Sequence, residues 1–191
     1  MSPLAEREKQ LLLELARRAL TAGVQKREPV QDFPDDINLR QPGGAFVTLH
    51  RRGRLRGCVG QLPSKDPLVE VVAHCAKAAA LEDPRFQPVP AEELAEIEIE
   101  LSILSPLEDV TLERIAPGRH GLVVSRGGRR GVLLPQVAME FNWQATRFLE
   151  ETCLKAGLER EAWKDPQTRV QAFTAEVFSE AALAPRENPQ R

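Results

Sequence analysis

Alternation of apolar and polar residues is clearest in IEIELSIL, residues 97–104. The apolar residues of this run would share one face of an extended chain: Ile97, Ile99, Leu101 and Ile103. This period of two predicts a strand that buries one face and turns Glu98, Glu100 and Ser102 to the other. β-rich runs on both sides of Arg51-Arg52-Gly53 and of Gly127-Gly128 predict two hairpins. A last alternating run, TRVQAFTAEVFSE at residues 168–180, predicts one further strand.

Helical periodicity predicts four helices. The first extends from Pro3 to Ala22, with Ser2 as its N-cap and Pro3 in its first turn. The second covers residues 68–81 after the cap Asp66-Pro67, and two more cover residues 135–142 and 145–157, the last ending at Gly157. Residues 24–44 are rich in Pro, Asp and Gly and predict an irregular loop. Helices interleaved with antiparallel hairpins predict an α+β fold with a mixed sheet packed against helices.

Charge and composition narrow the class of protein. The 191 residues include 26 Lys plus Arg and 28 Asp plus Glu, a formal net charge of −2, which argues against non-specific nucleic-acid binding. The apolar residues near the N-terminus are interrupted by charge too often for a secretory or membrane-spanning segment, so we expect a cytoplasmic protein with no membrane association. The length predicts one domain over residues 1–182, with two small lobes as the alternative, followed by a disordered polar tail over residues 183–191.

Three cysteines, Cys58, Cys75 and Cys153, lie far apart and form no CxxC pair. A disulfide framework or a sequence-local zinc site is therefore not expected, and neither a metal nor a cofactor is predicted. The common motifs of nucleotide binding, metalloproteases and serine hydrolases are absent from the sequence.

The segment RLRGCVGQL, residues 54–62, combines a cation, a thiol and two glycines. In a regular strand, Arg56, Cys58 and Gly60 would share one face, and a cation near a thiol stabilises the nucleophilic thiolate. Gly57 and Gly60 indicate a bulge, or the close approach of another backbone or a ligand. The alternative is that Cys58 is a small apolar filler beside a solvated arginine.

Further candidates come from carboxylates and one histidine. Glu98 and Glu100 on one strand face could serve acid–base chemistry, or could be only a solvated face. Asp83 and Arg85 in EDPRF could contact a ligand, or form a local salt bridge in a turn. His120, between two glycines in PGRHGL, could reach a cleft or could cap a loop.

Two combinations of these residues depend on the three-dimensional fold. Cys58, His120 and a carboxylate could act as nucleophile, base and orienting group. Arginines at the two hairpins could form an anion site if the hairpins adjoin, although hairpin arginines are commonly solvated: Arg51, Arg52, Arg54, Arg56, Arg126, Arg129 and Arg130.

Six segments, in this order and spacing, resemble the AMMECR-domain family: GAFVTLH, RLRGCVG, EDPRFQPV, IEIELSIL, GRHGLVV and GVLLPQVA. RLRGCVG resembles the family's signature, typically LRGCIG, with Val59 in place of isoleucine, which keeps the apolar character. The resemblance extends over about residues 5–180, and several separated motifs in order are far more specific than any one of them. Prokaryotic members resemble component A of the AmmeMemoRadiSam system, named for a Memo-like protein and a radical-SAM protein.

The resemblance implies a larger and a smaller lobe, with the signature strand near the cleft between them, and it implies no particular reaction. The family residues matched in this chain are Arg56, Gly57, Cys58, Gly60, Asp83, Arg85, Phe86, Glu100, His120, Gly121 and Pro135. We expect a small molecule or a modified residue to bind in this cleft. Whether the protein is an enzyme stays open, and the alternative is an adaptor without chemistry that docks onto Memo-like or radical-SAM proteins.

Within the expected site each residue has a role. The expected binding residues are Arg56, Gly57, Gly60, Asp83 and Arg85, with Arg56 orienting an anionic group. The expected catalytic candidates are Cys58, as a thiol ligand or nucleophile, and Glu100 or His120, which would move a proton.

Overall fold

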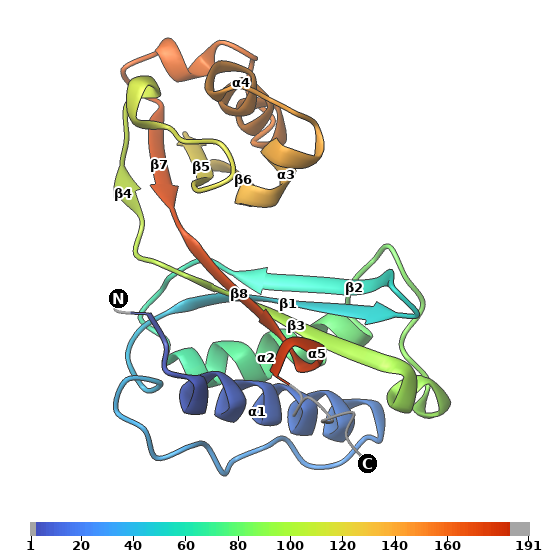
Figure 1. The fold of residues 1–191 in the computed structure, drawn as a ribbon. Coiled ribbons are helices and arrows are strands. Elements are labelled where there is room, and N and C mark those ends of the chain that lie inside the picture. The colour runs from blue at the N-terminus through green and yellow to red at the C-terminus, as the bar shows by residue number, and fades with distance from the viewer. Residues whose placement is uncertain (1–2, 184–191) are drawn as a thin grey trace, which may run out of the picture. The chain divides into compact units, whose positions relative to one another are not determined.

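The computed structural model describes residues 3–183 (Figure 1). The chain divides into two compact units: unit 1 takes in the described parts of Met1–Leu104 and Glu176–Arg191, and unit 2 is Ser105–Ala175. The expected cap Ser2 and the expected tail, apart from Leu183, lie outside the described residues. The α+β class is confirmed, and the sheets are antiparallel rather than mixed.

Unit 1 is a four-stranded sheet with two long helices packed against one of its faces (Figure 1). Its strands, in the order β2-β1-β3-β8, are β2 (Arg54–Gln61), β1 (Gly44–Arg51), β3 (Ile97–Leu104) and β8 (Ala175–Ser179). Its helices are α1 (Glu6–Val24), α2 (Leu68–Leu81), the 3-10 helix η1 (Ala91–Glu96) and the short α5 (Glu180–Leu183).

The core of unit 1 lies between the helices and the sheet. It is built from apolar positions at helical spacing on α1 and α2 and at alternate positions on the strands, all with no exposed surface: Leu12, Leu15, Leu20, Val72, Cys75, Val47, Leu49, Ile99 and Leu101. Burial of such side chains is the main stabilising term, about 1.5–3 kcal/mol for each large residue. The strand predicted for residues 97–104 is therefore confirmed, and its burial alternates from Ile97 to Leu101, but Ser102, expected on the polar side, is buried.

The turn between β1 and β2 explains why this hairpin forms. Arg52 and Gly53 both have positive φ angles, 51° and 72°. Two successive left-handed residues make the type I′ turn, whose twist matches that of the paired strands. The second predicted hairpin has the same geometry at Gly127 and Gly128, with φ angles of 55° and 82°.

Unit 2 is a second four-stranded sheet, in the order β4-β7-β5-β6. Its strands are β4 (Glu108–Asp109), β5 (Gly121–Arg126), β6 (Arg129–Leu133) and β7 (Arg169–Phe173). Its helices are α3 (Pro135–Glu140), α4 (Ala145–Lys155), and the 3-10 helices η2 (Leu112–Arg114) and η3 (Ala162–Lys164). A separate apolar core joins α4 to β5 and contains Leu122, Val124, Phe148, Leu149 and Cys153.

Two predicted elements differ from the structure. The single strand expected at residues 168–180 is two strands in different sheets, β7 and β8, because Thr174 makes its backbone hydrogen bonds with Ser105 instead of continuing one ladder. The first helix begins at Glu6 rather than at Pro3, and Ala5 is its N-cap residue. The Glu8 carboxylate accepts the backbone N–H of Ala5 at 2.6 Å.

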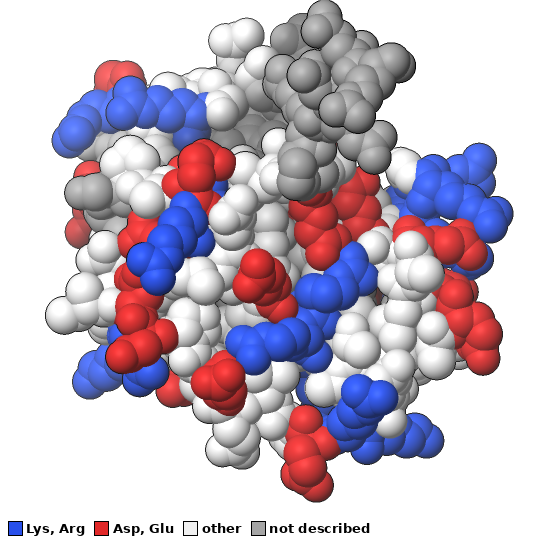
Figure 2. Space-filling view, turned by 60° about the horizontal axis from the view of Figure 1, so that its bottom comes forward, with Lys and Arg blue, Asp and Glu red and all other residues white. Residues whose placement is uncertain are grey.

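Surface charge is consistent with the near-neutral composition. On the face that Figure 2 shows, positive and negative side chains lie interspersed, without a continuous basic patch. A broad nucleic-acid-binding surface would require such a patch. Within residues 3–183, no helix is both long and apolar enough to cross a membrane.

Candidate functional site

Cys58 lies on the face of the unit 1 sheet opposite the helices. The strand register places Cys58 directly opposite Thr48 on β1, and Thr48 opposite Glu100 on β3. The Thr48 hydroxyl donates to Cys58 Sγ at 3.3 Å, and the thiol-bearing residue is half-buried. We call this sheet face, with Thr48, His50, Cys58, Glu98 and Glu100, the polar face.

The backbone of Cys58 is held by a carboxylate and a guanidinium. β2 is an edge strand, so the outward N–H and C=O groups of Cys58 have no strand partner on that side. The Asp83 carboxylate accepts the Cys58 N–H at 2.8 Å, and Arg85 donates to the Cys58 carbonyl at 3.3 Å. Asp83 and Arg85 therefore close the edge of the sheet at the thiol.

Asp83 and Arg85 also bind each other. Arg85 donates to both carboxylate oxygens of Asp83, at 2.9 and 2.6 Å. The Arg85 guanidinium holds the pKa of Asp83 well below its usual range, although burial of the carboxyl opposes this shift. The expected local salt bridge is present, and it additionally fixes the position of the residue that carries the thiol.

Arg56 is the extra residue of a β-bulge. The pairing of β1 with β2 shifts between Leu49, which lies opposite Gly57, and His50, which lies opposite Leu55. One more residue on β2 than on β1 interrupts the strict alternation of side chains at this point.

The Arg56 guanidinium binds away from the thiol. It donates to Glu93 at 2.8 Å and to the Gln87 carbonyl at 2.9 Å. Glu93 also pairs with Arg51 at 3.0 Å, whose position on β1 belongs to the helix-covered face. The expectation that Arg56 and Cys58 share one face is therefore wrong, because the bulge turns Arg56 toward Glu93.

Gly57 and Gly60 allow close packing inside unit 1. A Cβ atom on Gly57 would lie 2.1 Å from the carbonyl oxygen of Ala79, so glycine lets α2 approach β2. A Cβ atom on Gly60 would lie 2.1 Å from the ring of Phe46, which faces it across the hairpin. Close approach of the chain itself accounts for both glycines, and the bulge that they also indicated is present at Arg56, next to Gly57.

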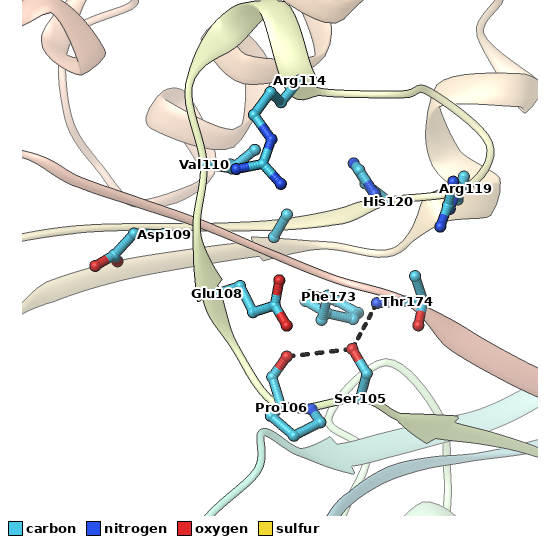
Figure 3. Close-up of a pocket in the computed structure, with 11 residues that line it drawn as sticks. Ser105, Pro106, Glu108, Asp109, Val110, Arg114, Arg119, His120, Phe173 and Thr174 are labelled. Carbon is cyan, nitrogen blue, oxygen red and sulfur yellow. Dashed lines mark hydrogen bonds between the residues drawn. The ribbon is translucent and has the colours of Figure 1, made fainter. Parts of the chain in front are cut away.

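His120 lies in unit 2, whereas Cys58 and Glu100 lie in unit 1. Its Nδ1 accepts the backbone N–H of Ala116 at 3.2 Å, so the ring caps its own loop. Burial lowers the pKa of His120, and the positive charges of Arg119 and Arg114 lower it further. His120 also lines a cavity of about 450 Å³ in unit 2 (Figure 3).

Unit 1 thus brings together four of the predicted residues, Cys58, Glu100, Asp83 and Arg85. Neither unit by itself contains the complete set of Cys58, His120 and a carboxylate. Thr48 was not a candidate in the sequence, although its place in the alternating run GAFVTLH is the signal that could have found it.

The hairpin arginines are largely bound by acidic groups within their own units. Arg51 and Arg52 pair with Glu96, and Arg126 pairs with Asp165 at 2.8 Å. These pairs favour the solvated-surface alternative over an anion site at the hairpin tips. Over residues 3–183 no group of three or more His, Cys, Asp or Glu residues is placed to hold a metal ion.

The structure defines this protein as a chain of two compact α+β units. At the edge of one antiparallel sheet, Asp83 holds the backbone of a cysteine. The chain belongs to the AMMECR1 family, whose model matches residues 13–178. It is 42% identical over 188 residues to a protein of Methanothermobacter thermautotrophicus, covering 94% of this chain and 97% of that one. It is 43% identical over 185 residues to Protein TK0174 of Thermococcus kodakarensis, covering 90% and 89%.

A solved structure supports the fold. The crystal structure of the uncharacterised protein PH0010 from Pyrococcus horikoshii is similar, with a TM-score of 0.82, 40% sequence identity and 90% of each chain covered. The resemblance inferred from the motifs is therefore confirmed at the level of family and fold.

Proposed function

We propose that the polar face of unit 1 binds a small molecule or a modified residue, with Cys58 as a thiol ligand or nucleophile. The observation that carries this proposal is the fixed position of Cys58. Its backbone is bound by Asp83 and Arg85, while its half-buried thiol has a hydroxyl donor in Thr48. A donor at Sγ stabilises a thiolate more than a thiol, because hydrogen bonds to charged acceptors are the stronger ones.

Roles within this site follow from the register. Glu100 is two strands away from Cys58, about 10 Å across the sheet. Glu100 therefore exchanges a proton with a bound ligand rather than directly with the thiol. Arg85 takes the role that the sequence suggested for Arg56, because its guanidinium reaches the Cys58 carbonyl and its side chain is 55% exposed. Gly57, Gly60 and Arg56 support the strand and do not contact the ligand.

Alkylation kinetics test the accessibility and activation of the thiol. The native protein is treated with iodoacetamide over a range of pH, and modification of each cysteine is followed by peptide mass spectrometry. Cys58 should react in the folded protein, and Cys75 and Cys153, both without exposed surface, serve as internal controls that react only on unfolding. Modification of Cys58 only on unfolding would contradict the proposal.

The role of the hydroxyl donor is tested with matched threonine variants. Thr48→Val keeps the shape and removes the donor at Sγ, so Cys58 should react several-fold more slowly near neutral pH. Thr111→Val, at an exposed position of unit 2, is the control and should leave the rate unchanged. Equal rates for the native protein and Thr48→Val would show that Thr48 does not tune the thiol.

The second candidate is an adaptor without chemistry, which docks onto Memo-like or radical-SAM proteins. Two observations favour it. Arg56, Gly57 and Gly60 are all accounted for by contacts within unit 1. Unit 2 exposes Met139 and Phe141, which are 64% and 60% accessible, as apolar groups suited to a protein interface.

Co-purification with a Memo-like and a radical-SAM protein distinguishes the two candidates. An adaptor should lose its partner on Phe141→Ser and keep it on Cys58→Ala. A ligand-binding role predicts that Cys58→Ala abolishes binding of a thiol-directed ligand and leaves the fold intact. Loss of folding on Cys58→Ala would instead support a purely structural cysteine.

A further inference from the structure

Charged and titratable side chains line a cavity of unit 2, and none of them belongs to the polar face of unit 1. Its volume is about 450 Å³, within the range of pockets that hold small metabolites. Figure 3 shows Glu108 of β4 and Arg114 of η2 extending toward the same space, with His120 and Arg119 on the adjoining loop.

Two cations and one carboxylate that line this cavity have no ion-pair partner among residues 3–183. Among the described residues, no acidic side chain lies within ion-pair distance of Arg114 or Arg119, and no basic one within that distance of Glu108. The other carboxylate, Asp109, is bound by Arg169 through two hydrogen bonds, of 2.7 and 3.2 Å. The lining therefore presents both signs of charge, each available to a ligand.

The hydrogen bond at Nδ1 determines which ring nitrogen of His120 carries the proton. Because Nδ1 accepts the Ala116 N–H, the proton of the neutral ring is assigned to Nε2, which becomes a donor. Burial and the positive charges of Arg119 and Arg114 lower the pKa of His120 and favour the neutral ring, although the Glu108 carboxylate opposes this shift. His120 can thus donate a hydrogen bond to an anionic oxygen without being charged itself.

The floor of the cavity is held by hydrogen bonds between its two chain segments. The Ser105 N–H donates to the Thr174 carbonyl at 2.9 Å. The Thr174 N–H donates to Ser105 Oγ at 2.9 Å, and Ser105 Oγ donates to the Pro106 carbonyl at 3.2 Å (Figure 3). These bonds hold the floor, and the Ala116 N–H orients the His120 ring, so these two parts of the lining lose little entropy when a ligand binds.

We propose that this cavity binds a small molecule that carries a carboxylate or phosphate at one end and an amino group at the other. Arg114, Arg119 and the Nε2–H of His120 bind the anionic end, and Glu108 binds the amino group. This site is independent of the proposed function of unit 1, because it shares no residue with the polar face.

Two-ended and one-ended probes test the proposal directly. Phosphoethanolamine is compared with inorganic phosphate and with ethanolamine, and β-alanine with propionate and with propylamine. Binding is followed by the side-chain NMR signals of the three histidines, that of His120 being identified with His120→Gln. At least one two-ended probe should shift the His120 signal and bind about tenfold tighter than either of its one-ended parts. The better pair identifies the anionic group as phosphate or carboxylate.

Matched variants separate a built site from general charge attraction. Arg114→Gln should weaken a two-ended probe and its anionic part by about tenfold, because a charge-assisted hydrogen bond is lost. Glu108→Gln should weaken only the two-ended probe, to the level of its anionic part. Arg130→Gln, an exposed arginine of the same unit, is the control and should have no effect.

Several results would overturn the proposal. One is the absence of any His120 shift at millimolar concentrations of both two-ended probes. Another is equal weakening by Arg130→Gln and Arg114→Gln, which would indicate non-specific attraction. The fluorescence of Trp143 and Trp163, both in unit 2, verifies that each variant remains folded.

Discussion

Replacing Asp83 by Asn tests whether the salt bridge at the edge of β2 holds the strand that carries the thiol. The Asp83 carboxylate accepts four hydrogen bonds: one from the Cys58 N–H, one from the Arg85 N–H and two from the Arg85 guanidinium. Asparagine has the same shape, but only one of its two terminal atoms accepts, and its NH₂ group would face donors.

The expected loss of stability depends on how far Asp83 and Arg85 are each buried. The Asp83 side chain is 3% exposed, so a lost hydrogen bond to a charged group there costs about 1.5–3 kcal/mol. The Arg85 side chain is 55% exposed, so water compensates much of its lost pairing. We therefore expect Asp83→Asn to lower the free energy of unfolding by about 2–3 kcal/mol in total.

Two measurements check this prediction. Urea unfolding followed by circular dichroism gives the free energy, and NMR hydrogen exchange gives the protection of the Cys58 amide, for which Asp83 is the acceptor. The amide should exchange faster in Asp83→Asn by a larger factor than the amides paired between β1 and β3. A free energy within about 0.5 kcal/mol of the native value, with unchanged protection at Cys58, would refute the reasoning.

The effect of Asp83 should also depend on pH. Because Arg85 depresses the pKa of Asp83 in the folded state, the ionised carboxylate stabilises the fold above the unfolded pKa of about 3.9. This contribution is lost as pH falls through that value toward the folded pKa. The stability difference between the native protein and Asp83→Asn should therefore shrink between about pH 5 and pH 2.

Three other predictions concern the two glycines of the motif, Cys75 and His120. Gly57→Ala should lower the free energy of unfolding by about 2–3 kcal/mol, because its Cβ would meet the backbone carbonyl of Ala79 in α2. Gly60→Ala should lower it by less, because its Cβ would meet only the Phe46 side chain, which can move to another χ1 rotamer. Urea unfolding giving the reverse order would contradict this. Burial raises the pKa of Cys75 to about 11, so iodoacetamide at pH 8 should leave Cys75 unmodified in the folded protein. Rapid labelling of Cys75, measured by mass spectrometry, would contradict this prediction. The NMR titration of His120 should have a midpoint below about 6.5, because burial lowers its pKa. The contribution of neutral His120 to the stability of the fold is lost as pH falls below that value. A higher midpoint would contradict the burial of the ring.

The regular elements of the fold could be predicted because local periodicity and turn chemistry determine them. The alternation at residues 97–104 and the glycines at both hairpin turns predicted strands that the structure contains. The run at residues 168–180 was misread as one strand because alternation continues smoothly through Thr174. Only the long-range hydrogen bonds of Thr174 to Ser105 separate the two sheets, and periodicity carries no information on such contacts.

The candidate site could be predicted only in part for a similar reason. Cys58, Asp83 and Glu100 were identified by residue type and by family resemblance. Their mutual placement depends on the strand register, which also brought in Thr48. The face expected for Arg56 was wrong because the glycines left open whether a bulge or a close approach was present, and only the pairing between the strands identifies Arg56 as the extra residue.

The residues of the RLRGCVG motif differ in how far packing explains them. Gly57 is required by the approach of α2, Gly60 by the Phe46 ring, and Arg56 holds Glu93, so none of the three needs a ligand. At Cys58 the fold uses only the backbone N–H and C=O, which any residue except proline supplies. Packing therefore does not explain why a thiol stands opposite a hydroxyl donor on the polar face. A functional account of the motif rests on the Cys58 side chain, and reactivity measured at this one atom is the observation that decides between binding site and scaffold.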